Sequence, residues 1–110
     1  MYRQPNTTIM GAPFDAATIR AVWNRGATVF GLDPRLWRRD SFSRLIHFND
    51  FGNEESDHGW HIDHIRPVSV GGFDGLQNLQ PLHWKANLEK ADSFPIEFQS
   101  KLLEHVVFSV

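Results

Sequence analysis

The chain contains no cysteine in its 110 residues. This absence excludes disulfide bonds, iron–sulfur clusters and every zinc site built on thiolates. No apolar run approaches the roughly 18 residues that a transmembrane helix needs, and residues 1–5 lack the apolar stretch of a secretory signal peptide. We therefore expect a soluble chain with no visible targeting segment. Its compartment stays open, because a cytoplasmic protein and a delivered effector would look alike.

The remaining composition is that of an ordinary globular protein. Hydrophobic residues make up 41% of the chain and charged residues 22%. This length suits one compact domain and is too short for two full-sized ones. The core of such a domain is small, so bound metals or partners can contribute to its stability.

The net charge of −2 hides an asymmetry along the chain. Up to residue 48 there are seven arginines and three acidic residues, whereas the rest contains four basic and ten acidic residues. All seven early basic residues are arginine, the side chain best suited to bidentate contact with phosphate. A single arginine is most often a solvated surface residue. Together, the seven predict a surface that faces phosphate groups.

The first half of the sequence predicts an arm and one helix. Residues 1–13 show no sustained periodicity and are interpreted as an arm or loop. Asp15 is a natural N-cap for a helix over residues 16–25. Ile19, Val22 and Trp23 form its apolar stripe, and Gly26 marks its end.

The second half predicts two strands and two helices. Strands are expected over residues 45–48 and 60–65. A long glycine-rich loop follows, and Pro81 suits the first position of a helix that runs to residue 91 or 92. Trp84, Leu88 and Ala91 would form the inward stripe of that helix. A last short helix is expected over residues 96–107, with an apolar tail at 106–110.

Polar residues that can carry chemistry gather around this strand, loop and helix. The cluster contains His58, His61, Asp63, His64, Asn78, His83 and Asn87. A carboxylate, an amide oxygen and an imidazole are ligands for divalent cations, and so few ligands leave open positions for water and phosphate. Adjacent strand residues point to opposite faces, so Asp63 and His64 share one site only where the strand is distorted. Histidines on a half-buried strand are equally often packing residues.

The sequence of residues 59–92, GWHIDHIRPVSVGGFDGLQNLQPLHWKANLEKAD, resembles the core motif of the HNH endonuclease family. The family pattern is Asp-His-Ile-x-Pro, a glycine-rich loop with Asp, Asn-Leu-Gln, and then a helix that carries His or Asn with a Lys near its end. The resemblance covers about a third of the chain. It is dense across that segment, and this chain departs from many relatives in lacking their two Cys-x-x-Cys pairs.

The resemblance implies an α+β fold with a ββα-metal core, which is a two-stranded antiparallel hairpin, a long loop and a helix around one divalent ion. Residues 1–110 would then form a single nuclease domain. Its parts would be an arm at 1–13, the N-terminal helix and linker at 14–36, the ββα-metal core at 37–92 and a C-terminal extension at 93–110.

The resemblance also implies roles for individual residues. His64 would be the general base, and Asp63 and Asn87 would bind the metal. His83 would be a third ligand or a phosphate contact, and Asn78 would bridge the loop backbone and hold the strand of His64. Phosphate contacts would come from Lys90 and from early arginines, for which we selected Arg38, Arg39 and Arg44.

The function implied is metal-dependent hydrolysis of DNA phosphodiester bonds, with little sequence preference. The expected cofactor is Mg²⁺ or Mn²⁺, with Zn²⁺ or Ni²⁺ as alternatives because His61 is expected on the same strand face as Asp63. More often a residue such as His61 is surface decoration. The expected partner is DNA, with RNA as an alternative and an immunity or phage-packaging protein as a further partner.

Three other interpretations stay open. The first is a nucleic-acid-binding module without catalysis, which would need neither Asp63 nor His64. The second is a structural metal-binding or protein-interaction domain built on His58, His61 and His83. The third is a nuclease toxin domain with an immunity partner, which keeps the same chemistry.

Overall fold

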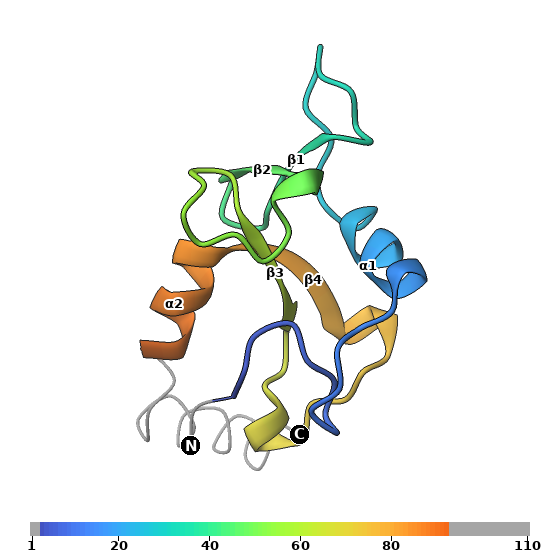
Figure 1. Ribbon diagram of the computed structural model, residues 1–110, viewed down its shortest axis with the longest axis vertical. Coiled ribbons are helices and arrows are strands. Elements are labelled where there is room, and N and C mark those ends of the chain that lie inside the picture. Colours follow the sequence, from blue (N-terminus) through green and yellow to red (C-terminus); the bar gives the residue numbers. More distant parts are fainter. Residues whose placement is uncertain (1–2, 93–110) are drawn as a thin grey trace, which may run out of the picture.

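The computed structural model describes residues 3–92. In this part of the chain, two antiparallel hairpins and two helices form a small α+β fold (Figure 1). The β3–β4 hairpin lies between the two helices. None of the helices in residues 3–92 is long and apolar enough to cross a membrane. The elements are α1 (Ala16–Trp23), β1 (Trp37–Arg39), β2 (Leu45–His47), β3 (Trp60–His64), β4 (Leu79–His83) and α2 (Trp84–Asp92), with 3₁₀ helices η1 (Phe48–Asp50), η2 (Val68–Val70) and η3 (Leu76–Asn78).

Helix α1 begins where the sequence predicts. The Asp15 side chain accepts a hydrogen bond of 2.7 Å from the backbone N–H of Thr18, which satisfies one of the unpaired donors in the first turn. The helix ends at Trp23, two residues before the predicted end. Val22 and Trp23 are fully buried, so the predicted apolar stripe faces the core.

The two predicted strand segments are present, but they do not pair with each other. Strand β2 pairs with β1, and Trp37 lies opposite His47. Strand β3 pairs with β4, and His64 lies opposite Leu79 at the end of the ladder. Neither partner strand, β1 nor β4, was predicted from the sequence. The order of elements is compatible with an HNH-type fold, and the long loop joins β3 to β4.

The prediction that Pro81 begins the second helix is wrong. Pro81 lies in β4 opposite Ile62, and α2 begins at Trp84. Proline is tolerated at an edge of a sheet where no ladder hydrogen bond needs its N–H. The N–H of Ile62 points away from Pro81 and donates to Asn6 Oδ1 over 2.7 Å, so this residue pair needs no such bond.

The later start of α2 changes which of its side chains are buried. Ala86 is buried, whereas Leu88 is 41% exposed, so the predicted inward position of Leu88 is wrong. Trp84 is half-buried and donates from Nε1 to the carbonyl oxygen of Ser56 over 2.7 Å. The Ala91 side chain, the predicted helix over residues 96–107 and the tail at 106–110 lie outside the described residues.

Aromatic packing forms the centre of the core. The rings of Trp23 and Trp60 lie 5.1 Å apart, and Phe48 and Phe51 contact Trp60 from other directions. Trp60 also donates from Nε1 to the carbonyl oxygen of Phe48 over 3.2 Å. The first residue of β3 is thereby fixed against α1 and η1. The buried members of this cluster are Val22, Trp23, Ile46, Trp60, Ile62 and Leu79.

We expect Trp60→Ala to lower the free energy of unfolding by about 3–5 kcal/mol, because it removes a fully buried ring that the core cannot replace. Urea unfolding at equilibrium measures the change. Phe30→Ala is the control, because Phe30 is fully exposed and its loss should change stability by less than about 0.5 kcal/mol. Equal losses in the two variants would contradict this description of the core.

Candidate active site

A pocket of about 300 Å³ lies between β3, α2, η2 and the N-terminal arm. Its walls are formed by residues 3–7 of the arm, residues 61–64 of β3, residues 67–69 at η2, and Asn87, Leu88 and Lys90 of α2. Four of the predicted site residues therefore meet in one place, namely Asp63, His64, Asn87 and Lys90. The other predicted residues, Asn78, His83, Arg38, Arg39 and Arg44, do not line this pocket.

The Asp63 carboxylate is buried and paired with a cation. Lys90 Nζ lies 2.6 Å from Asp63 Oδ2, and Gln80 Nε2 donates to the same oxygen over 2.9 Å. Lys90 also donates to the carbonyl oxygen of His64 over 2.8 Å. The ammonium group therefore compensates the carboxylate charge, whereas the sequence predicted Lys90 as a phosphate contact. Both donors use Oδ2, so Oδ1 is the oxygen that remains for a further cation.

His61 is a buried member of the site and not a surface residue. Its exposed fraction is 2%. Nδ1 lies 2.9 Å from Asn87 Nδ2, and Nε2 lies 3.3 Å from Glu54 Oε2. Burial lowers the pKa of His61 below its ordinary value, and the neighbouring Glu54 carboxylate opposes this shift only in part. Neutral His61 accepts the Asn87 amide, which leaves the Asn87 Oδ1 atom for a cation.

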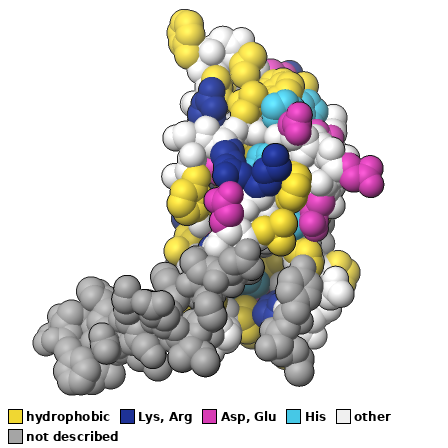
Figure 2. Space-filling view, turned by 90° about the vertical axis from the view of Figure 1, so that its left-hand side faces the viewer, with side chains coloured by type: hydrophobic (Ala, Val, Ile, Leu, Met, Phe, Trp, Pro, Cys, Tyr) yellow, Lys and Arg dark blue, Asp and Glu magenta, His cyan; other side chains and the backbone are white. Residues whose placement is uncertain are grey.

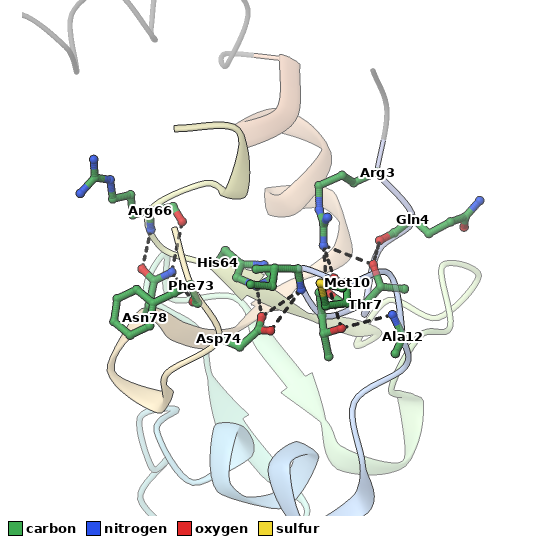
Figure 3. A network of polar contacts seen from close by, with 12 residues as sticks. Arg3, Gln4, Thr7, Met10, Ala12, His64, Arg66, Phe73, Asp74 and Asn78 are labelled. Atoms are coloured by element: carbon green, nitrogen blue, oxygen red, sulfur yellow. Dashed lines mark hydrogen bonds and ion pairs between the residues drawn. The ribbon is translucent and has the colours of Figure 1, made fainter. Parts of the chain in front are cut away.

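His64 and Asp63 both line the pocket, although they are neighbours on β3. His64 Nε2 lies 2.8 Å from Asp74 Oδ1. Figure 3 shows the two side chains facing each other. The side chain of His64 is only 10% exposed, and its ring lies beside Phe14. His64 is the last residue of the β3 ladder, where the chain leaves regular strand geometry and enters the loop.

Asn78 fastens the loop that follows β3. Its Oδ1 accepts from the backbone N–H of Arg66 over 2.8 Å, and its Nδ2 donates to the carbonyl oxygens of Arg66 and Phe73 (Figure 3). The Asn78 side chain is buried. A side chain at Gly72 would overlap the Arg66 carbonyl group, so the close loop packing requires glycine there.

The structure does not bring His83 to the pocket. His83 Nε2 contacts the carbonyl oxygen of Asp57 over 2.7 Å, and Nδ1 accepts from the backbone N–H of Lys85 over 3.0 Å. Its own backbone N–H donates to Asp40 Oδ2. Neither ring nitrogen is left for a metal or a phosphate. The helix predicted from Pro81 would have contained both His83 and Asn87, but His83 ends β4 and α2 begins at Trp84.

The three arginines predicted to bind nucleic acid differ in their contacts. Arg38 donates to the carbonyl oxygens of Asn24, Gly26 and Pro34, which stabilises the end of α1. Arg44 pairs with Glu89 over 2.8 Å. Arg39 is exposed, and its side chain donates to the Ser43 carbonyl oxygen of its own hairpin. Figure 2 shows basic side chains lying among acidic and hydrophobic ones on the face it displays.

Three residues of the site were missed by the sequence analysis. Asp74 entered the sequence analysis only as the Asp of the glycine-rich loop in the family pattern and was given no role, although a loop acid close to the candidate base was a usable signal. Gln80 contacts Asp63, and Asn6 binds the edge of β3. No signal in the sequence pointed to Asn6. Within residues 3–92, no three His, Cys, Asp or Glu side chains are grouped as they would be around a metal ion.

The protein has a small α+β fold, and its pocket brings together the carboxylate of Asp63, the imidazole of His64 and the amide of Asn87 between β3 and α2. Residues 50–93 match the model of the HNH endonuclease family. The matched segment includes β3, β4 and the described part of α2, and the match supports a relation to the HNH family, whose members are generally nucleases. Neither the curated proteins nor the solved structures include a match to this chain.

Lys90→Met is expected to destabilise the metal-free protein by about 3 kcal/mol, because it leaves the buried Asp63 carboxylate without its cation. Chemical unfolding in the presence of EDTA measures this loss. Lys85→Met on the same helix is the control, because Lys85 is exposed and the change should stay within about 0.5 kcal/mol. The two variants would be equally stable if the Asp63 pair contributed nothing.

Acid is expected to destabilise the metal-free protein through His61. Because the pKa of His61 is lowered in the folded state, the unfolded chain binds a proton at higher pH than the folded chain. The contribution of neutral His61 is therefore complete above the ordinary pKa of 6.5 and is lost as the pH falls below it. Unfolding measured between about pH 7.5 and about pH 5 should show a smaller pH dependence in His61→Gln than in the wild type. An equal dependence would contradict the assignment.

Proposed function

We propose that this protein is a metal-dependent endonuclease that hydrolyses phosphodiester bonds of DNA, with His64 as general base. The observation that carries the proposal is the meeting of Asp63, His64 and Asn87 in one pocket. The family match over residues 50–93 supports the same class of activity. These residues lie on β3 and α2, so the scaffold places an acid, a base and an amide oxygen within one small volume.

Asp63 and Asn87 are the residues that would hold a divalent ion. Their available atoms are hard oxygen donors, which suit Mg²⁺ or Mn²⁺, and two protein ligands leave positions open for water and phosphate. A bound ion would supply Lewis-acid stabilisation of the charge that develops on phosphate oxygens during hydrolysis. His83 is left out of this ligand set, because the protein backbone occupies both of its ring nitrogens.

His64 would take a proton from the attacking water. An imidazole is suited to this task because it accepts and releases protons near neutral pH. Its ring lies in the wall of the pocket, one residue from Asp63. Asn78 would keep this end of β3 in place through its hydrogen bonds to the loop backbone. Lys90 would neutralise Asp63 before a metal binds.

Nucleic acid would approach the mouth of the pocket beside the arm and α2. Of the three predicted arginines, Arg39 is exposed. Arg38 donates to a backbone carbonyl oxygen, and Arg44 pairs with Glu89. The described part of the chain has no spare element of a size to enter a DNA groove, and base readout normally needs one. We therefore propose cleavage with little sequence preference.

A plasmid assay tests the proposal. Supercoiled DNA is incubated with the protein and with Mg²⁺, Mn²⁺, Ni²⁺ or Zn²⁺, and nicked and linear products are quantified. We expect product that disappears with EDTA and falls by at least about 100-fold in His64→Ala. Metal affinity, measured by calorimetry, should stay within a few-fold in this variant. His47→Gln is the matched control, because His47 lies outside the pocket.

Two outcomes would contradict the proposal. Cleavage by His64→Ala at a rate near that of the wild type would remove His64 as the base. If the folded protein binds a metal but cleaves neither DNA nor RNA under any condition, the nuclease assignment fails and a binding module is favoured. Cleavage of RNA alone would keep the mechanism and change the substrate.

A further inference from the structure

The Asp74 carboxylate lies between the His64 ring and the N-terminal arm (Figure 3). Its Oδ1 is 2.8 Å from His64 Nε2. The backbone N–H of Ile9 reaches both carboxylate oxygens, at 3.2 Å and 3.1 Å. We propose that Asp74 is the positioning residue of His64, and that the N-terminal arm holds Asp74 in place. This inference rests on the proposed function of His64 as the base.

The chemistry of the contact fixes which ring nitrogen carries the proton. An ionised carboxylate accepts hydrogen bonds and donates none. A neutral His64 therefore carries its hydrogen on Nε2, and Nδ1 keeps the lone pair that can take a proton from water. Among the described residues no hydrogen bond is made to Nδ1, and the His64 side chain is part of the pocket lining.

A carboxylate behind an imidazole also restricts ring rotation and stabilises the cation that forms when the base takes a proton. Asp74 is not among the residues that line the pocket, so it would act through His64 and not on the substrate. Removal of the outer partner of a metal-bound histidine typically costs about 10–100-fold in metal affinity or activity, and we expect a loss of this size in activity for Asp74.

The arm contacts the site on two sides of His64. Asn6 Oδ1 accepts from the backbone N–H of Ile62, two residues before His64, over 2.7 Å. Ile9 holds Asp74 on the other side. The arm is also held by contacts within itself, because the Arg3 side chain donates to the carbonyl oxygens of Thr7 and Thr8. The arm is therefore part of the frame that orients the base.

The first experiment observes the tautomer of His64 directly, without any cleavage. Nitrogen-15 NMR of the metal-free protein should show His64 protonated on Nε2 in the wild type. Asp74→Ala should give a mixture of both tautomers. Asp33→Ala is the control, because Asp33 is an exposed carboxylate paired with Arg35, and it should leave the His64 signals unchanged. An unchanged Nε2–H tautomer in Asp74→Ala would overturn the proposal.

The second experiment is a double-mutant cycle on cleavage. Asp74→Ala should lower kcat by about 10–100-fold while KM for DNA and metal affinity stay within a few-fold. In the His64→Ala background the same change should have no further effect, because the group it positions is gone. A further loss of similar size in that background would show a structural role and overturn the proposal.

Asp74→Asn keeps the test valid if the alanine variant is unstable. The Ile9 N–H also binds this carboxylate, so asparagine would turn its oxygen toward Ile9 and its amide N–H toward Nε2. It should therefore favour hydrogen on Nδ1 and lower kcat. If Asp74→Asn is folded and carries its hydrogen on Nδ1 of His64 while kcat stays within a few-fold of the wild type, the proposal fails. Absence of cleavage by the wild type would refute the proposed function, whereas the NMR result would still decide the role of Asp74.

Discussion

The indole of Trp60 is the contact on which the site depends. It is fully buried, packs on Trp23 and donates to the Phe48 carbonyl oxygen, so it fixes the first residue of β3 to the rest of the protein. Asn78 fixes the loop that leaves the other end of the strand. The residues proposed to carry the chemistry lie between these two anchors. In a chain without cysteine, packing and buried hydrogen bonds perform this task without a thiolate metal site.

Much of the fold could be predicted from local patterns. The Asp15 cap, the buried face of α1 and the two apolar strand segments follow from residues close together in the sequence. The pairing of the strands could not be predicted in this way, because β1 lies in a basic stretch, β4 contains Pro81, and neither carries a periodic apolar signal. Pro81 shows the difficulty, because a proline that suits the first turn of a helix also suits an edge strand that needs no N–H.

The candidate site was predictable only in part. Asp63, His64 and Asn87 were selected from spacing and from the family resemblance, and they do line one pocket. The contacts that surround them join distant parts of the chain, since Ile9 and Asp74 are 65 residues apart and Asp63 and Lys90 are 27 apart. His83 was misplaced for a related reason. It would lie beside Asn87 only if one helix contained both residues, and α2 begins one residue after His83.

The pairing of Asp63 with Lys90 has a consequence for the charge of the pocket. Because the ammonium group balances the carboxylate, folding without a divalent ion does not leave this buried charge uncompensated. On the proposed function, an incoming ion would add its charge to a pocket in which Lys90 already balances Asp63 and Arg3 also lines the wall. The attraction for a polyanion would rise at that moment, since long-range steering depends on the net local charge. On the proposed function, metal binding would therefore strengthen the attraction of the protein for nucleic acid.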